Sequence, residues 1–383
     1  MSFLERWKSM RGHSTFSKLK WFLYKALWLD LLKSGVIYGN GALRIVNSET
    51  RRYEDCLPPE KIVCVTGFGH SGSGAVVDLL SEYACTHVEG YVDQNGSLRK
   101  EPGREFDILR HAGGLFCLES AVQNKNPFVQ DACVKLFLAL IANHCDDPRC
   151  SYKDALVNSA RRFLDEILDF SLPSSWGYDF CPHMAFMSDR GYDLLFDRSD
   201  SERQAIFFLK EMSMDEYRLA ARRFLALTLG KLASEKILVL DQIVSDGTAD
   251  IRKYQAYFGD MKLIAVWRDP RDVFVTANIR GEDWIPHDVD SFVRWYRRIM
   301  PYLSLNDLNY KCIRFEKLVL DYSDEVSAIE EFLGIDDRQH VAPKSAFDPG
   351  VSSKNVGIHK QYLTEFGKEL KVIEDSLGEF LFC

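Results

Sequence analysis

Residues 61–74 read KIVCVTGFGHSGSG and carry the clearest structural signal in the chain. The run KIVCVT at 61–66 is short and rich in β-branched residues, which is typical of a strand buried on both faces. A turn with four glycines in eight residues follows at 67–74, and the residues after it repeat at helical spacing, with an apolar face formed by Val76, Leu79, Leu80 and Tyr83. Such a turn between a strand and a helix predicts an anion site, because glycines let the backbone approach a ligand and the N–H groups of the turn and helix start point toward it.

Similar apolar runs predict four further strands. The second ends near Val88–Glu89, and the others are Lys236–Leu240, Lys262–Trp267 and Lys311–Phe315. Strands that alternate with helices predict an α/β fold with a five-stranded parallel sheet and right-handed crossovers.

A long helical block separates the second and third predicted strands. Residues 105–234 are mostly helical by period, most clearly at Val134–Ala142, Ala155–Phe170 and Met214–Leu232. We therefore expect an α/β domain at 60–383 with a helical insertion at 105–234, and an insertion of this size usually shapes a substrate site.

The composition excludes several classes of protein. The chain has 383 residues, 46% hydrophobic and 27% charged, so that it can bury a sizeable core. The formal net charge of −8 argues against a nucleic acid polymer as partner. Ten cysteines scattered through predicted strands and helices favour reduced thiols in a cytoplasmic protein. We expect no metal site, because no standard zinc spacing is matched by the group Cys145, Cys150, Cys181 and His183.

The N-terminal segment at 1–55 forms a separate part of the prediction. Residues 1–35 hold seven basic and two acidic groups, and their apolar residues recur at three- and four-residue steps. This pattern fits a helix packed on the domain, and it fits equally a helix lying on an anionic membrane surface. The second interpretation predicts peripheral contact with the inner face of the membrane. The segment lacks the pattern of a secretory signal.

The glycine turn alone leaves the identity of the anion open. Aligned on Gly67 and Gly72, it resembles a nucleoside-triphosphatase loop, but Ser73 occupies the lysine position, which disfavours kinase or ATPase activity. The same turn satisfies the dinucleotide fingerprint, with Glu89 near the expected acidic position. A nicotinamide- or flavin-dependent oxidoreductase is therefore an alternative.

A second motif follows the fourth predicted strand. The sequence Arg268-Asp269-Pro270-Arg271-Asp272 lies at the carboxyl end of a strand, where parallel sheets bind ligands. Arg268 can bind a phosphate through two N–H groups, and Thr276 can donate a hydroxyl to the same group. The plainer interpretation is a salt-bridge cluster in which Asp269 and Asp272 cap the next helix, and it is compatible with the first.

Together the two motifs resemble the sulfotransferases that use 3′-phosphoadenosine-5′-phosphosulfate (PAPS). Arg314–Val319 is similar to the strand and helix that come next in that family, and Ser353–Lys360 is similar to its C-terminal loop. The resemblance covers roughly residues 60–90 and 235–362. It implies a P-loop-like three-layer domain, PAPS as donor, 3′-phosphoadenosine-5′-phosphate (PAP) as product and no metal.

The resemblance also implies roles for particular residues. The family's binding site for the 5′-phosphosulfate corresponds to Gly69, His70, Ser71, Gly72, Ser73 and Gly74. The 3′-phosphate is expected to bind Arg268 and Thr276. The loop that closes over the nucleotide is expected to contribute Lys354, Asn355 and Gly357. His70 stands where the family carries lysine or arginine, so that leaving-group stabilisation falls to it and to the loop N–H groups. The general base is expected at Glu89 first and His111 second, with Asp93, Glu101 and Glu105 as further candidates.

The acceptor is expected to be a hydroxyl of a carbohydrate. The aromatic residues Trp176, Tyr178, Phe180 and Tyr192 of the insertion suit sugar stacking, and they suit an ordinary core equally. If residues 1–35 contact a membrane, a lipid-linked glycan or glycolipid is the expected acceptor. A non-catalytic protein that binds PAPS or PAP is a further alternative.

Overall fold

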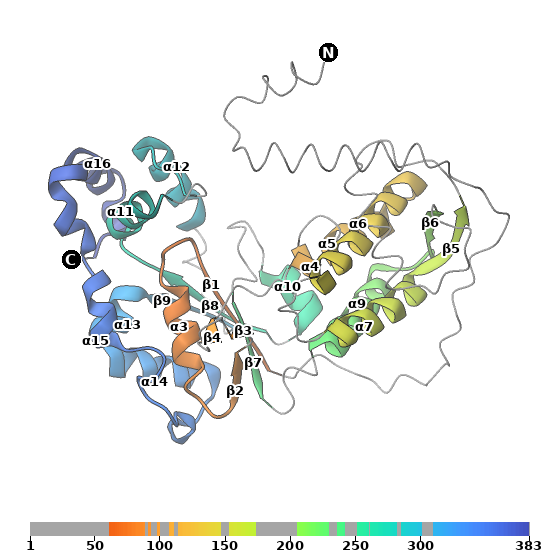
Figure 1. The fold of residues 1–383 in the computed structure, drawn as a ribbon, viewed down its shortest axis with the longest axis horizontal. Helices are drawn as coiled ribbons and strands as arrows, with labels where there is room; N and C mark the ends of the chain where they lie inside the picture. The colour runs from red at the N-terminus through yellow and green to blue at the C-terminus, as the bar shows by residue number, and fades with distance from the viewer. Residues whose placement is uncertain are drawn as a thin grey trace, which may run out of the picture. The chain divides into compact units, whose positions relative to one another are not determined.

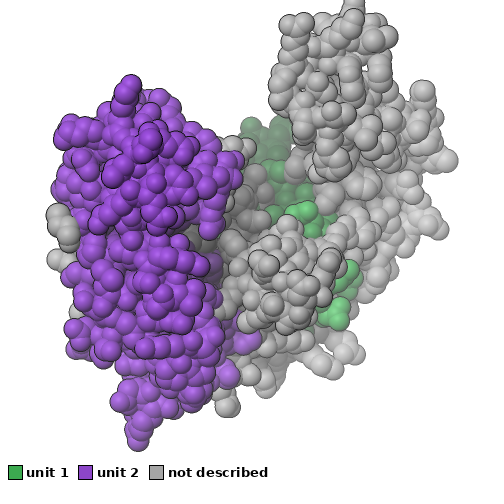
Figure 2. Space-filling model, turned by 60° about the vertical axis from the view of Figure 1, so that its left-hand side comes forward, with its two compact units in different colours: residues 1–55, 105–224 green, residues 56–104, 225–383 purple. Residues whose placement is uncertain are grey.

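The computed structural model of the chain describes residues 61–88, 91–92, 98–99, 107–110, 114–146, 153–173, 205–229, 236–241, 251–259, 261–281, 285–300 and 309–382. The predicted N-terminal helix at 1–35 lies outside these residues. The chain divides into two compact units, coloured in Figure 2. Unit 1 comprises residues 1–55 and 105–224, and unit 2 comprises residues 56–104 and 225–383.

Unit 2 is built on a five-stranded parallel sheet, which confirms the predicted fold class (Figure 1). The strand order is β2-β7-β1-β8-β9, with β1 in the centre. The strands are β1 (Ile62–Gly67), β2 (Thr86–Val88), β7 (Ile237–Asp241), β8 (Lys262–Trp267) and β9 (Tyr310–Arg314). Each lies within about one residue of the corresponding predicted run, because short apolar runs in a buried parallel sheet are the strongest signal in this sequence.

Helices cover this sheet and leave its central strand inaccessible. All six residues of β1 are buried. One apolar cluster joins alternate sheet residues such as Val63 and Ile264 to α3, α13 and α14, and a second joins Phe68 to α11, α12 and α16. The helices of unit 2 are α3 (Ser73–Leu80), α10 (Ile251–Phe258), α11 (Pro270–Arg280), α12 (Val289–Ile299), α13 (Phe315–Leu320), α14 (Tyr322–Leu333), α15 (Pro349–Ser352) and α16 (Leu363–Ser376).

Two short strands and several single turns complete unit 2. Strands β3 (Tyr91–Val92) and β4 (Leu98–Arg99) pair antiparallel, apart from the main sheet. The 3₁₀ turns are η3 (Asp337–Gln339), η4 (Ser353–Asn355), η5 (Ile358–Tyr362) and η6 (Gly378–Phe380).

Unit 1 consists mainly of helices around an aromatic core, in which the rings of Phe137, Phe163 and Phe224 contact one another. Its helices are α4 (Asp107–Arg110), α5 (Leu115–Gln123), α6 (Pro127–Asp146), α7 (Lys153–Ile167) and α9 (Met214–Leu229), and the division between the units falls inside α9. By length and composition alone, Pro127–Cys145 of α6 could cross a membrane, but 56% of it is buried inside the protein. Its Lys135 and Asp131 form a buried ion pair with a distance of 2.7 Å, as suits a core helix.

The insertion also contains an antiparallel strand pair that the helical period does not predict. Strand β5 (Leu168–Pro173) pairs with β6 (Ala205–Leu209), so the helix predicted to continue to Phe170 ends at Ile167. The backbone N–H of Phe207 donates to Asp131 of α6. Pairing with a distant segment overrides the local helical period here.

Candidate functional site

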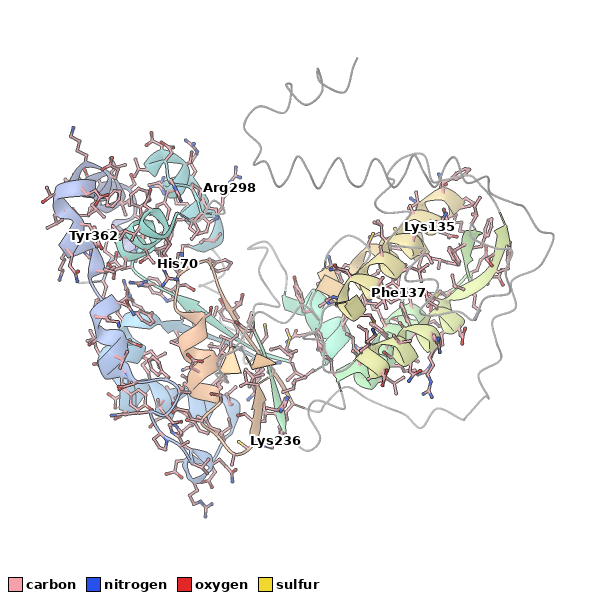
Figure 3. The ribbon with its side chains drawn as sticks, viewed as in Figure 1. His70, Lys135, Phe137, Lys236, Arg298 and Tyr362 are labelled. Carbon is pink, nitrogen blue, oxygen red and sulfur yellow. The ribbon has the colours of Figure 1, made fainter. Side chains whose placement is uncertain are left out.

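The glycine turn stands at the carboxyl end of β1, and its conformation requires glycine at one position above all. Gly72 has φ +95°, and a Cβ there would lie 2.3 Å from Cδ2 of Phe315. His70 also has a positive φ, of 50°. The turn leads into Ser73, the first residue of α3, so that it lies at the N-terminus of this helix. Figure 3 labels His70 in this turn and Lys236 just before β7, at opposite ends of the sheet.

Arg268 follows β8, the strand next to β1, and the residue is 5% exposed. Its Nη1 donates to the carbonyl of His70 (3.2 Å), and its Nη2 donates to the carbonyl of Asn355. The guanidinium lies over the ring of Phe315, 5.2 Å from the centroid. The Nε atom is buried and has no hydrogen-bond partner. Burial lowers the pKa of Arg268, against the opposing effect of Asp272, and the group remains charged at neutral pH.

One cavity of about 680 Å³ in unit 2 brings the two motifs together. Predicted site residues in its wall are His70, Gly72, Ser73, Gly74, Arg268, Thr276 and Asn355. Its size is typical of a small-molecule site. Backbone N–H groups from the turn and cations from α11 and the end of β8 can bind a ligand that carries anionic groups at two places.

Other predicted site residues do not line this cavity. Gly69 is absent from its wall, and Ser71 is buried, with its Oγ 2.1 Å from where a Cβ on Gly67 would lie. The side chain of Lys354 is exposed to solvent. The N–H of Gly357 donates to Oδ2 of Asp272 (2.7 Å), so that it is not available to a ligand.

The candidate general bases Glu89 and His111 lie outside the described residues, as do Asp93, Glu101 and Glu105, and their roles stay predictions. The described strand β2 ends at Val88, which pairs with Val239 of β7. Strand β7 lies between β2 and β1.

The C-terminal segment from His340 to Tyr362 forms one wall of the cavity, and Glu82 anchors its first end. Glu82 is 2% exposed. Its carboxylate accepts the N–H groups of Lys344 (3.0 Å), Ala346 (2.8 Å) and Phe347 (2.8 Å), and its Oε2 lies 2.8 Å from Nε2 of His340.

Asp272 anchors the other end of this wall. It is fully buried and accepts the N–H groups of Gly357 (2.7 Å) and His359 (3.0 Å), and its Oδ1 lies 2.5 Å from Nδ1 of His359. Burial acts to raise the pKa of Asp272, but the hydrogen bonds from His359 and Gly357 and the charge of Arg268 outweigh it and lower the pKa.

The structure separates the roles of the two aspartates that the sequence assigns to helix capping. Asp269 caps α11, because its Oδ1 accepts the N–H of Arg271 at 2.8 Å. The same prediction for Asp272 is wrong: its carboxylate binds the C-terminal wall instead of the helix start.

Sequence reasoning missed several residues of the cavity. Arg280 stands one helical turn after Thr276 on α11, and the four-residue spacing is a signal that could have found it. Phe315, Phe347 and Asp348 also line the cavity, without a comparable signal in the chain. Among the described residues, no group of three or more His, Cys, Asp or Glu side chains could hold a metal ion. Three residues considered for a metal cluster, Cys150, Cys181 and His183, lie outside the described residues.

The sheet, the turn and the facing arginine define an α/β protein with a cavity at the carboxyl ends of its central strands. No protein-family model matches the chain, and no curated protein sequence matches it significantly. Among solved structures it is similar to the sulfotransferase domain of the Synechococcus PCC 7002 olefin synthase, with a TM-score of 0.37 and 13% identity over 79% of this chain and 89% of that chain.

Two further similarities are of the same kind. The sulfotransferase domain of the curacin biosynthetic pathway gives a TM-score of 0.34 and 13% identity over 76% of this chain and 80% of that chain. Sulfotransferase STF1 of Mycobacterium tuberculosis H37Rv gives a TM-score of 0.33 and 14% identity over 78% of this chain and 76% of that chain. Because these TM-scores are below 0.5, the function proposed below depends on the residues of the cavity.

Proposed function

We propose that the protein is a sulfotransferase that moves a sulfuryl group from PAPS to a hydroxyl of a carbohydrate acceptor. The observation that carries the proposal is that the glycine turn and Arg268 with Thr276 line one cavity. A nucleotide with a 5′-phosphosulfate and a 3′-phosphate needs two anion sites at the ends of one pocket. The buried, unpartnered Nε of Arg268 fits such a ligand.

The residues of the turn act on the charge that develops during transfer. PAPS would supply the sulfuryl group: its S–O bond to the 5′-phosphate breaks while the acceptor oxygen forms a new bond to sulfur. Charge then grows on the phosphate oxygen that leaves. N–H groups of the turn and the imidazole of His70 are proposed as the donors for that oxygen, because donors held in place stabilise the transition state without reorganisation.

The acceptor hydroxyl must lose its proton to a base. Glu89 is our first candidate and His111 our second, because the resemblance to the family implies a carboxylate or imidazole in this part of the chain. The insertion at 105–234 is proposed to form the acceptor side. A lipid-linked acceptor is proposed only if residues 1–35 bind membranes.

The strand order disfavours the dinucleotide alternative. In a dinucleotide-binding domain the second strand pairs directly with the first, and an acid at its end binds the ribose of the nucleotide held by the first loop. Here β7 lies between β1 and β2. That alternative also gives no role to Arg268 in the cavity.

Binding of PAP, NAD and ATP to the full chain tests the nucleotide part of the proposal. A ligand that binds the native state raises the melting temperature, and we expect a shift with PAP and none with NAD or ATP at equal concentration. A shift with NAD alone would favour the oxidoreductase.

Transfer of labelled sulfate from PAPS to a pool of glycans tests the chemistry. PAP binding without transfer to any acceptor would favour the non-catalytic alternative. Glu89→Gln and His111→Gln then identify the base: the variant of the true base loses transfer and keeps PAP affinity.

A further inference from the structure

Arg268 divides its donors between the fold and a ligand. Its two Nη atoms donate to the carbonyls of His70 and Asn355, and thereby connect the glycine turn to the C-terminal wall. A guanidinium has five N–H groups, so the Nε–H, which has no partner, and one N–H on each Nη remain. Arg268 therefore offers a ligand these remaining groups and a single positive charge.

A phosphate monoester carries close to two negative charges at neutral pH, so a second cation is expected beside Arg268. The C-terminal loop does not supply it, because Lys354 is exposed and lies outside the cavity wall. The wall also contains the carboxylates of Asp78 and Asp348, which make an unassisted phosphate site less favourable.

Arg280 has the properties that such a cation needs. It lines the cavity, and it stands four residues after Thr276 on α11, so the two side chains lie on the same face of the helix. Its side chain is exposed, and no described residue forms a hydrogen bond or ion pair with its guanidinium. It is close enough to Arg268 for its charge to act on the pKa of that group.

We propose that Arg280 binds the phosphate at the Thr276 end of the cavity and is the residue by which the protein distinguishes a nucleotide with a 3′-phosphate from one without it. This inference rests on the proposed function, which places the 3′-phosphate at that end. The chemical class of the ligand is an adenosine 3′,5′-bisphosphate.

The test is calorimetric titration of the full chain with PAP and with AMP, which lacks the 3′-phosphate. We expect Arg280→Ala to weaken PAP binding by about 10- to 100-fold, the range for a lost hydrogen bond between charged groups. AMP binding should change by less than about threefold, since AMP has no group at this position. The Kd for PAP should also depend less steeply on salt concentration in Arg280→Ala than in the wild type, because the variant has lost one charge at the site. Arg280→Lys, which keeps the charge and loses the fork of donors, should give an intermediate affinity for PAP.

Arg298→Ala is the matched control. Arg298 is an exposed arginine on α12 of the same unit and is absent from the cavity wall (Figure 3). It should leave the affinity for both nucleotides unchanged.

Three results would overturn the inference about Arg280. The proposed function would survive each of them, provided that the wild-type chain binds PAP. The three results are PAP affinity of Arg280→Ala within threefold of wild type, an equal loss for PAP and AMP, and an equal effect of Arg298→Ala. A wild-type chain that does not bind PAP would overturn both proposals together.

Discussion

Replacing Asp272 by asparagine tests how the C-terminal wall of the cavity is held. Asp272 is fully buried and accepts three hydrogen bonds, from the N–H groups of Gly357 and His359 and from the side chain of His359. Its Oδ2 also lies 3.7 Å from Nη2 of the buried Arg268. Asparagine keeps the size of the side chain, removes its charge and places an NH₂ group against these donors.

The magnitude follows from these contacts. Hydrogen bonds to a charged group contribute about 1.5–3 kcal/mol each. Breaking a buried ion pair by removing one partner costs about 3–5 kcal/mol, because the remaining charge is left uncompensated. The contributions share one carboxylate and do not add, so we expect Asp272→Asn to lower the free energy of unfolding by about 3 kcal/mol. PAP binding should weaken as well, since residues 357–359 lose their anchor.

The pH dependence has a definite sign. The pKa of Asp272 is lower in the folded protein than in the unfolded chain. Its stabilising effect is therefore fully present above the unfolded pKa of about 3.9 and is lost as pH falls through the folded pKa. The difference between wild type and Asp272→Asn should be constant between about pH 7 and 5 and should shrink below about pH 4.

Urea unfolding of the full chain at several pH values measures both effects. Asp375→Asn is the matched control, because Asp375 pairs with Lys371 at 2.8 Å and its side chain is 63% exposed. That variant should unfold at nearly the same urea concentration as wild type. A loss of less than about 1 kcal/mol for Asp272→Asn, or a loss equal to that of the control, would refute this account of the wall.

Three further predictions concern the turn, the other anchor and the thiol of Cys312. Gly72→Ala should lower the free energy of unfolding by about 2–4 kcal/mol and weaken PAP binding, because of its positive φ and the contact with Phe315. Gly74→Ala is the control and should not destabilise the protein, because a Cβ at this position meets nothing within 4 Å. Equal urea midpoints for Gly72→Ala and Gly74→Ala would contradict the prediction. Glu82→Gln should cost about 2–3 kcal/mol in the same assay, because a buried carboxylate with three backbone donors loses its charge; no loss would mean that this anchor is dispensable. Burial raises the pKa of Cys312 to about 12. Iodoacetamide at pH 8 should therefore label Cys312 about a thousandfold more slowly in the folded than in the urea-unfolded chain, measured by peptide mass spectrometry. Equal rates would contradict the raised pKa.

The parts of the fold that the sequence predicts are those with a strong local cause. The five strands are short apolar runs that have to be buried on both faces, so that their position depends little on distant partners. The position of Arg268 beside the glycine turn follows from parallel strands, whose carboxyl ends meet at one edge of the sheet.

The parts that the sequence does not predict depend on distant contacts. Strand β5 begins where the helical period still continues, and its partner β6 lies more than thirty residues later. Asp272 stands in the first turn of α11, where an acidic residue usually stabilises the helix start, but donors 85 and 87 residues away take its carboxylate. Glu82 has no neighbouring motif that would single it out, because its partners at 340–347 are known only once the chain is folded.

The residues of the turn fit the proposed sulfuryl donor better than a nucleoside triphosphate. A γ-phosphoryl group carries about one negative charge more than a sulfuryl group, and nucleoside triphosphatases meet it with a lysine in the loop and a bound metal ion. In this chain Ser73 stands at the lysine position, and the turn offers N–H groups and the imidazole of His70. Of the two arginines of the cavity wall, Arg268 donates to the carbonyl of His70 in the turn, and Arg280 stands on α11. Neither replaces a lysine in the turn itself. Introducing a lysine by Ser73→Lys should therefore raise ATP affinity without raising sulfate transfer from PAPS; an increase in transfer would mean that charge at the turn, rather than positioning, limits the reaction.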